Sequence, residues 1–356
     1  MRIGILTFHR AHNYGAMLQA YALQVVLETN GHDVSFVDYE LPHIKKAYKW
    51  FYGIRSIVNR HFFTHGIKTL YYLPASKSRY NKFRKFCNSF LHDTHDGLKS
   101  LNDKFDIIIV GSDQVFNMNI TAGINNPYWG DIPFTKDIIT YAASSNTFNV
   151  SKELIQQIPQ KIKRFKALSV RESFVAKYLQ SFTEKDIVVT LDPTLLISRF
   201  DWEKIVISPK YNKKYIFYYY VRDNERALEF AYNFAKSKKL PLIVLGSFNY
   251  QYSTKIALPS GPREFLGWIM NAEYVISSSF HCTVFSLIFN KQFCSIDLND
   301  GNDGRISSLL ERFDLSNRMV KLDAIPTEEN INWIEINNKL CNYKEPSLSY
   351  LYNNIK

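Results

Sequence analysis

The chain has 356 residues, of which 46% are hydrophobic and 22% charged, and its formal net charge is +11 at pH 7. The length suits two domains of ordinary size, and the composition is that of a globular protein, which excludes a disordered or fibrous chain. No apolar run reaches the roughly 18 residues that a transmembrane helix needs, and Ile3–Leu6 is too short for a signal peptide.

In the first half of the chain, apolar β-rich runs alternate with helical patterns, as in α/β domains with parallel sheets. Helices are expected at Tyr14–Thr29, which Gly31 closes, and at Leu154–Phe165. Strands are expected at Arg2–Phe8, Asp33–Tyr39, Asp106–Gly111, Ile138–Ala143 and Leu168–Arg171.

The segment 41–92 accounts for the excess of positive charge. It contains no Asp or Glu, and aromatic residues such as Trp50 and Phe62 are interleaved with its charges. A cationic, aromatic segment indicates an anionic surface partner, and a solvated helical insertion is the alternative. Its eleven basic residues are Lys45, Lys46, Lys49, Arg55, Arg60, Lys68, Lys77, Arg79, Lys82, Arg84 and Lys85.

A second α/β series follows, and the domain boundary is expected near Asp192–Arg199, where the Leu-Asp-Pro-Thr turn at 191–194 interrupts the pattern. Its expected strands are Ile187–Leu191, Tyr215–Val221, Pro241–Gly246, Tyr274–Ser278 and Phe293–Asp297. Its expected helices are Asn224–Lys238, Pro262–Ala272, Thr283–Phe289 and Arg305–Phe313.

The predicted fold is therefore α/β, with two Rossmann-like, doubly wound domains facing each other across a cleft. Residues 1–192 make the N-terminal domain, with 41–92 as an insertion, and residues 193–326 make the C-terminal domain. The tail 327–356 contains an expected helix at Glu328–Leu340 and is predicted to cross back to the first domain.

The first candidate site motif is Asn13-Tyr14-Gly15, which follows the first strand and opens the first helix. Free backbone N–H groups and the helix dipole favour an anion there, and a glycine lets the backbone approach a ligand closely. The structural alternative is that Asn13 caps the helix and Gly15 permits packing.

The second motif places Ser112, Asp113 and Gln114 directly behind the apolar run 107–110. Ligands of open α/β sheets bind at such strand ends. Asp113 is suited to accept a proton from a substrate hydroxyl or to orient that hydroxyl. Alternatively, Ser112 and Asp113 cap a helix.

The third motif ends a predicted buried strand with Arg171. An arginine there is costly unless an anion or a carboxylate meets it, and its planar fork suits a carboxylate or phosphate ligand. Pairing with Glu172 or another acid is the structural alternative.

The fourth motif is a serine-rich strand end, 277–279, that leads into His281 at the start of an apolar helix. Histidine is the commonest general acid or base, although a hydrogen-bonded helix cap is the alternative. A Ser-His hydrolase is disfavoured because no G-x-S-x-G elbow is present. Two further candidate anion ligands are Lys291, which follows this helix, and Arg305, which opens the next helix.

Cysteine and histidine spacing argues against a metal site. The four cysteines lie far apart and the nine histidines show no ligand spacing. We therefore expect a cytoplasmic protein with reduced thiols and no metal. Nucleic acid is not an expected partner, because no recognition fold accompanies the positive charge.

Taken in order, the motifs resemble those of the polysaccharide pyruvyltransferase family, over roughly residues 3–318. The matching segments are Asn13–Gly15, Val110–Asn117, Ser169–Glu172, Leu191–Leu196 and Ser277–Phe293. In one respect the chain departs from the family pattern. Ser279 stands where some branches have an arginine, so that either another cation binds the pyruvyl donor of the family or the donor is a different molecule.

The resemblance implies a GT-B-like fold and transfer of a pyruvyl group from phosphoenolpyruvate, as co-substrate and without a cofactor, to sugar hydroxyls. It implies His281 as the catalytic acid and Arg171 and Arg305 as ligands of the donor's anionic groups. The acceptor would be a surface polysaccharide or a lipid-diphosphate-linked precursor, and segment 41–92 would dock on the anionic inner face of the membrane. Residues expected to contact substrates are Asn13, Tyr14, Gly15, Ser112, Asp113, Gln114, Ser279 and Lys291.

Two other interpretations stay open. One is a GT-B glycosyltransferase that uses a sugar nucleotide, with Asp297 or Asp303 on the ribose. The other is a non-catalytic, membrane-associated scaffold of glycan assembly, which would keep the basic segment and release no phosphate.

Overall fold

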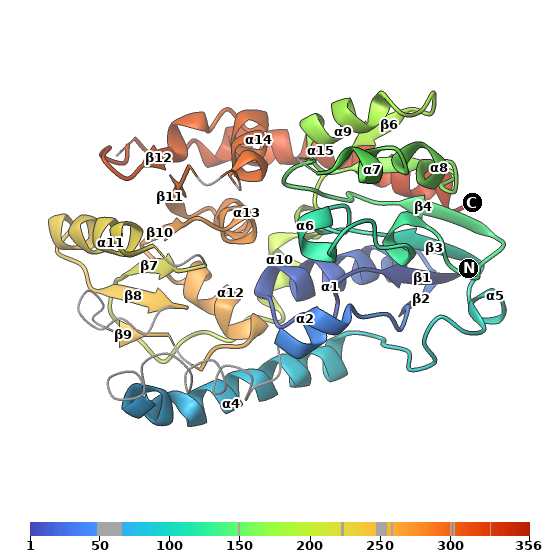
Figure 1. The fold of residues 1–356 in the computed structure, drawn as a ribbon. Coiled ribbons are helices and arrows are strands. Elements are labelled where there is room, and N and C mark those ends of the chain that lie inside the picture. Colours follow the sequence, from blue (N-terminus) through green and yellow to red (C-terminus); the bar gives the residue numbers. More distant parts are fainter. Residues whose placement is uncertain are drawn as a thin grey trace.

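The computed structural model describes residues 1–356 except 48–65, 149, 222–223, 247–254, 258, 300, 302 and 328. Its described part contains two parallel-sheet α/β domains that lie side by side (Figure 1). The predicted fold class, two Rossmann-like domains in a GT-B-like arrangement, is therefore confirmed. The strands expected from the sequence are all present, although most are one to three residues shorter than the apolar runs that indicated them.

The N-terminal sheet consists of parallel strands in the order β2-β1-β3-β4. The pair β5-β6 continues it, because single bridges from Ile139 to Ala167 and from Ala143 to Val170 join β4 to β5. Strand β3 is buried along its whole length, as expected for a parallel strand covered on both faces. The strands are β1 (Arg2–Leu6), β2 (Asp33–Phe36), β3 (Ile107–Val110), β4 (Asp137–Thr140), β5 (Leu168–Val170) and β6 (Ile187–Val189).

The C-terminal sheet has the order β12-β11-β10-β7-β8-β9, which is the common Rossmann order of six parallel strands. Its two outer strands, β9 and β12, are too short to stand out in the sequence as apolar runs. The strands are β7 (Ile216–Tyr219), β8 (Leu242–Leu245), β9 (Lys255–Ile256), β10 (Tyr274–Ser277), β11 (Gln292–Asp297) and β12 (Met319–Lys321).

Helices cover both sheets. Those of the first half are α1 (Tyr14–Thr29), α2 (Pro42–Ala47), α4 (Gly66–Phe90), α5 (Leu101–Lys104), α6 (Met118–Thr121), α7 (Lys152–Ile155), α8 (Ile158–Ile162) and α9 (Ser173–Gln180). Those of the second half are α10 (Arg199–Glu203), α11 (Glu225–Ser237), α12 (Pro262–Met270), α13 (Phe280–Ile288), α14 (Gly304–Arg312) and α15 (Trp333–Asn354). Short 3₁₀ turns are η1 (Pro127–Trp129), η2 (Pro193–Leu195) and η3 (Ser316–Arg318).

Two predicted helices are wrong in extent. The helix expected at 154–165 is broken into α7 and α8, because Pro159 lacks an N–H and its ring excludes the carbonyl of Ile155, where α7 ends. The helix expected at 328–340 instead begins at Trp333 and continues to Asn354 as α15. Glu328, the start of the predicted helix, lies outside the described residues.

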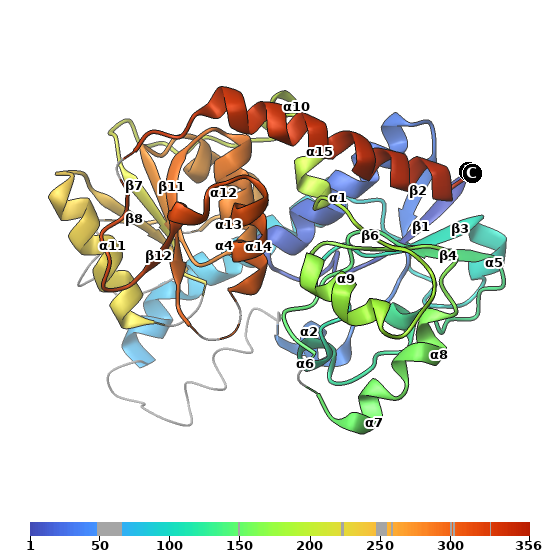
Figure 2. The same ribbon diagram turned by 90° about the horizontal axis from the view of Figure 1, so that it is seen from above.

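Two long helices join the domains on opposite sides. Helix α4 runs along one side of both domains (Figure 1), where Lys82 of α4 pairs with Glu264 of α12 and donates to the Pro259 carbonyl at 3.0 Å. Helix α15 crosses from the C-terminal domain to the N-terminal one (Figure 2), where the Tyr350 hydroxyl donates to the Thr140 carbonyl at 3.0 Å. The carboxyl ends of β1 and β10 meet at the boundary between the domains, because Gly15, which follows β1, lies against His281, which follows β10.

The strand orders indicate where this boundary binds ligands. In the first sheet, β2 lies on one side of β1 and β3 on the other, and in the second sheet β8 and β10 flank β7 in the same way. Loops that leave neighbouring strands in opposite directions open a crevice at the carboxyl ends of those strands. The loops after β1, β3 and β10 all start there.

Candidate active site

His281 reaches the domain boundary from the first turn of α13. Ser279 caps this helix, because its hydroxyl accepts the Cys282 N–H at 3.4 Å. The imidazole is buried, with 8% of the side chain exposed, and its Nε2 atom makes no hydrogen bond among the described residues, its contact with the Asp192 carboxylate being an ion pair at 3.5 Å.

The imidazole of His281 packs against the first turn of α1, in the other domain. A Cβ atom added at Gly15 would come within 2.0 Å of His281 Nδ1 and 2.3 Å of its Cγ. Gly15 is therefore needed because any side chain would overlap the ring. The contact fits the structural alternative, in which Gly15 permits packing, and the group that it admits is the candidate acid. Asn13 also caps α1, accepting the Ala16 N–H at 3.2 Å.

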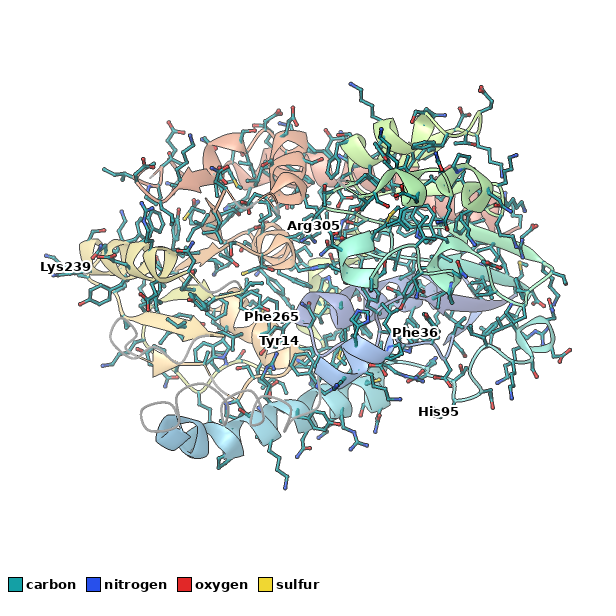
Figure 3. The ribbon with its side chains drawn as sticks, in the orientation of Figure 1. Tyr14, Phe36, His95, Lys239, Phe265 and Arg305 are labelled. Atoms are coloured by element: carbon teal, nitrogen blue, oxygen red, sulfur yellow. The ribbon has the colours of Figure 1, made fainter. Side chains whose placement is uncertain are left out.

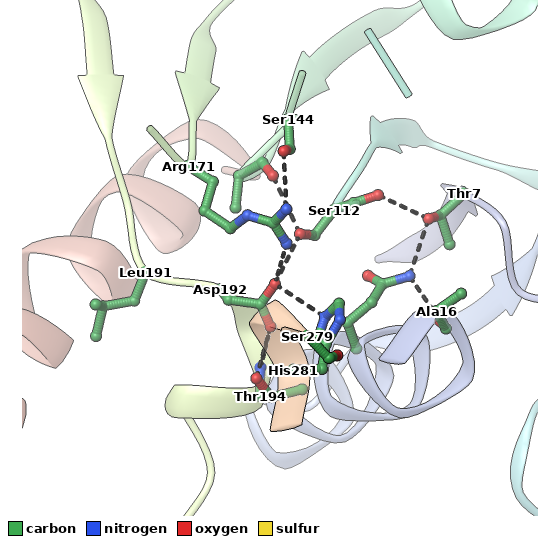
Figure 4. A network of polar contacts seen from close by, with 12 residues as sticks. Thr7, Ala16, Ser112, Ser144, Arg171, Leu191, Asp192, Thr194, Ser279 and His281 are labelled. Atoms are coloured by element: carbon green, nitrogen blue, oxygen red, sulfur yellow. Dashed lines mark hydrogen bonds and ion pairs between the residues drawn. The ribbon is translucent and has the colours of Figure 1, made fainter. Parts of the chain in front are cut away.

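Asp192 faces the imidazole from the turn that links the domains. Its Oδ2 atom lies 3.5 Å from His281 Nε2 and accepts a hydrogen bond of 2.6 Å from Arg171 Nη1 (Figure 4). Its Oδ1 atom accepts the N–H and hydroxyl of Thr194 at 3.0 and 2.6 Å. Burial alone would raise the pKa of this carboxyl, but His281, Arg171 and Thr194 hold it well below its usual value. Asp192 is therefore a fixed negative charge.

Sequence reasoning missed Asp192. The Leu-Asp-Pro-Thr turn indicated a domain boundary, and an aspartate before Pro-Thr is common as a local cap. Asp192 does cap η2 through Oδ1. Its Oδ2 atom faces His281 instead, and the residues next to Asp192 in the sequence do not indicate that contact.

Arg171 is held by protein groups on three of its nitrogens. Nη1 donates to Asp192, Nε donates to Glu172 at 2.8 Å, and Nη2 donates to the Ser144 hydroxyl at 2.8 Å. Phe280 covers its face at 4.1 Å. Burial would lower the pKa of the guanidinium, but Glu172 and Asp192 raise it above its usual value. The carboxylate pairing that the sequence left as the alternative is present, and the guanidinium is neutralised in this arrangement.

Arg305 lies beside this cluster on α14, together with a residue that sequence reasoning overlooked. Arg305, Ser308 and Arg312 share one face of α14 and line a small pocket of about 20 Å³ with Arg171 and Asp192. Arg312 makes no ion pair with any other described residue, and burial lowers the pKa of its guanidinium, while Tyr343 and Glu172 oppose this shift. The i, i+7 spacing of the two arginines was the signal available in the sequence.

The loop after β3 lines a second, separate pocket. Asp113 and Gln114 meet Asn13 around a cavity of about 100 Å³ that Ala16 and Ile44 complete. Gly111 enables this turn, because it has a φ of +115° and a Cβ there would lie 2.3 Å from the Tyr141 carbonyl oxygen. The structure thus brings three of the predicted substrate residues together.

Ser112 stands behind this pocket rather than in it. It is fully buried, its hydroxyl donates to the Ala142 carbonyl at 3.1 Å, and it lies 3.4 Å from Asp192 Oδ2. Its backbone carbonyl accepts the Thr7 hydroxyl at 2.8 Å. In this arrangement Ser112 supports Asp192 and does not face a substrate.

Tyr14 and Lys291 also lie away from the site. Tyr14 is buried between the domains, stacked on Phe265 at 4.7 Å (Figure 3), and its hydroxyl donates to the Ser260 carbonyl at 3.0 Å. Lys291 precedes β11, at the amino end of the sheet, whereas His281 follows the carboxyl end of β10. The interpretation of Lys291 as an anion ligand overlooked that α13 returns the chain from the carboxyl end of the sheet to its amino end, where Lys291 lies.

In the part of the chain that the structure describes, no three His, Cys, Asp or Glu side chains gather as a possible metal site. Nor does any described helix combine the length and apolar character that crossing a membrane requires.

Comparisons with known proteins give one informative result. The model of the family described as polysaccharide pyruvyl transferase matches residues 13–300. Among curated proteins there is no significant sequence match.

Several solved structures are similar over most of the chain. They include a putative UDP-N-acetylglucosamine 2-epimerase from Listeria monocytogenes (12% identity, TM-score 0.48, covering 97% of this chain and 89% of that one). A UDP-GlcNAc 2-epimerase from Neisseria meningitidis has 12% identity and a TM-score of 0.47, covering 98% and 93% of the two chains. A mutant O-GlcNAc transferase from Thermobaculum terrenum has 11% identity and a TM-score of 0.45, covering 99% and 64%. Similarity at this level carries no argument about the site.

The contact between Gly15 and His281 yields a first prediction. In Gly15→Ala, the new methyl group overlaps the imidazole, so the ring is displaced from Asp192. We expect the histidine Hε1–Cε1 NMR signal assigned to His281 to shift. The matched control is Gly304→Ala, because the nearest atom to a Cβ there is 3.8 Å away. An unchanged His281 signal in Gly15→Ala would contradict the packing described.

Proposed function

This chain belongs to the polysaccharide pyruvyl transferase family, and on that premise we propose that it transfers a pyruvyl group from phosphoenolpyruvate to two hydroxyls of a sugar. The acceptor is a surface polysaccharide or its lipid-linked precursor. The observation that carries the proposal is the buried His281–Asp192 pair, which lies at a domain boundary beside two arginines of α14.

The chemistry requires a proton at the methylene carbon of the donor. The imidazolium of His281 supplies it, and the adjoining carbon becomes electrophilic. One sugar hydroxyl attacks that carbon and gives its proton to the imidazole, which the first step left neutral, and a second hydroxyl displaces the phosphate, which leaves with the bonding electrons of its C–O bond and takes up that hydroxyl's proton. The product is a cyclic ketal with a new methyl group. Asp113, beside Asn13 and Gln114, orients the acceptor hydroxyls.

A compact anion such as phosphoenolpyruvate needs convergent cations. Arg171 already satisfies two carboxylates, so gripping the donor would require it to release one of them. We therefore assign the donor to Arg305 and Arg312, which supply the positive charge that Ser279 lacks. Their pocket, at about 20 Å³, has room for one water molecule, so that donor binding requires α14 to move outwards.

Asp192 is the positioning residue in this scheme. A carboxylate facing Nε2 stabilises the imidazolium and holds the ring in one orientation. Arg171 and Ser112 in turn fix the carboxylate.

The basic helix α4 supports docking on an anionic membrane surface. In its described part, Lys77, Arg84 and Lys85 are exposed, whereas Lys82 is paired with Glu264. Lys49, Arg55 and Arg60 of the same segment lie outside the described residues. A basic side chain near an anionic leaflet contributes about 1 kcal/mol. On this basis we propose peripheral association with the inner face of the cell membrane.

The function is tested by PEP-dependent phosphate release. With a glycan acceptor present, the protein should release phosphate and add the mass of a pyruvyl ketal to the glycan, measured by mass spectrometry. In His281→Ala the rate should fall by about 10²–10⁴, the usual worth of acid–base catalysis, without loss of fold. His95→Ala, at an exposed histidine, is the control. Thermal stabilisation by UDP-sugars but not by phosphoenolpyruvate would favour a glycosyltransferase, and release of no phosphate with any acceptor would favour a scaffold.

The Asp192→Asn substitution tests the positioning role. Because the ring loses the carboxylate that faces Nε2, we expect part of the factor of about 10²–10⁴ to be lost in kcat and the NMR signal assigned to His281 to shift. The Asp137→Asn variant, at an exposed aspartate paired with Lys166, should leave kcat and the His281 signal unchanged. An unchanged His281 signal in Asp192→Asn, or a rise in KM with kcat unchanged, would contradict the positioning role.

Membrane docking is tested by flotation with vesicles. Binding to vesicles that contain anionic lipid should fall in the double variant Lys77→Glu, Lys85→Glu, and it should weaken as salt rises. The double variant Lys236→Glu, Lys239→Glu removes the same charge from the exposed end of α11 and should bind normally. Equal binding by the two variants, or no lipid-dependent binding at low salt, would refute the docking surface.

A further inference from the structure

A third cavity lies in the N-terminal domain and plays no part in the proposed chemistry. It has a volume of about 250 Å³ and opens between the loop after β1, the loop after β2 and helix α4. From α4 it receives Tyr80, Arg84, Cys87 and Asn88, which share one face of the helix. The cavity is larger than either of the pockets near His281.

One wall of the cavity is aromatic. The His12 ring lies 4.7 Å from the Tyr80 ring and is stacked on Phe83 at 5.2 Å. Burial, together with Arg79 and Arg84, lowers the pKa of His12 to about 4, so this ring is neutral at pH 7. Aromatic walls of this kind offer a flat apolar surface with polar atoms at its edge.

The opposite wall carries carboxylates whose positions are fixed. Asp93 accepts two hydrogen bonds from Arg10, at 2.6 and 2.7 Å, and one of 3.1 Å from His9. Burial would raise the pKa of Asp93, but His9 and Arg10 lower it, so this group is ionised at neutral pH. Glu40 is half-buried and lies 4.0 Å from Lys45.

Hydrogen-bond donors complete the lining. Within the described residues, the Arg84 guanidinium forms no ion pair and the Asn88 amide makes no hydrogen bond. Three cations, Arg10, Lys45 and Arg84, face two carboxylates, and Arg10 also pairs with Asp38. The charges are therefore nearly balanced and alternate in sign, which suits a neutral molecule with many hydroxyls better than a polyanion.

The cavity adjoins the reacting centre. His12, in its wall, is three residues from Gly15, which contacts the His281 ring, so the two Cα atoms are at most about 11 Å apart. Helix α2 separates it from the Asp113 pocket, because Ile44 lines that pocket and Lys45 lines this cavity. The two spaces therefore flank the same short helix.

We infer that this cavity binds a neutral pyranose unit of the acceptor, next to the unit that receives the pyruvyl group. The ring stacks on Tyr80 and His12, and its hydroxyls donate to Asp93 and Glu40 and accept from Asn88 and Arg84. This inference rests on the proposed function, because it extends the acceptor site. It makes the protein selective for acceptors of two or more sugar units.

Saturation-transfer NMR on the full chain tests the sugar site without any need for catalysis. The probes are methyl glycosides of glucose, galactose, mannose and N-acetylglucosamine, with inorganic pyrophosphate as the anionic competitor. Asn88→Trp fills the cavity from an exposed position on α4, and Asn81→Trp places the same side chain outside it on the same helix. At least one glycoside should show saturation transfer that falls in Asn88→Trp and persists in Asn81→Trp.

Kinetics then separate this inference from the proposed function. In Asn88→Trp, the KM of a two-unit acceptor relative to that of a one-unit acceptor should rise by about 10-fold, equivalent to 1.4 kcal/mol. Equal saturation transfer in the two variants, an unchanged KM ratio, or displacement of the sugar by pyrophosphate would overturn the sugar site. Absence of phosphate release in the wild type would instead overturn the proposed function, while the NMR comparison would still decide whether the cavity binds sugar.

Discussion

A single buried carboxylate organises the domain boundary. Asp192 is completely enclosed, and an ionised group in that position is tolerated only when cations and hydrogen-bond donors surround it. Its partners come from four separate places: Ser112 after β3, Arg171 after β5, Thr194 in the linking turn and His281 at the start of α13. Because His281 belongs to the C-terminal domain, the contacts of Asp192 also link the two domains.

The sequence predicts the fold well because each strand and helix has a local pattern of apolar and polar residues. Strands β1, β3 and β10 are short apolar runs followed at once by polar residues, and the parallel order brings those ends to one edge. His281 and Asp113 were identifiable for this reason. The sequence did not show whether Arg171 binds a ligand or pairs with carboxylates of the protein. An arginine at a strand end is compatible with both, and the outcome depends on Asp192, 21 residues away. Tyr14 shows the same limit, because its stacking on Phe265 depends on how the two domains dock.

The two domains contribute different chemistry. Helix α14 of the C-terminal domain brings two arginines, a concentration of positive charge that suits a small anion. The N-terminal domain lines its pockets with amides, carboxylates and aromatic rings of nearly balanced charge, which suits hydroxyl groups. His281 lies between these environments, with its ring against α1 and its Nε2 toward Asp192.

Helix α4 contacts both domains and also carries exposed basic residues. One face lines the sugar cavity through Tyr80 and Asn88, another is tied to the C-terminal domain through Lys82 and Glu264, and Lys77 and Lys85 point to solvent. The proposed membrane docking surface and the proposed sugar cavity therefore lie on one helix, which also joins the two domains through the Lys82–Glu264 pair.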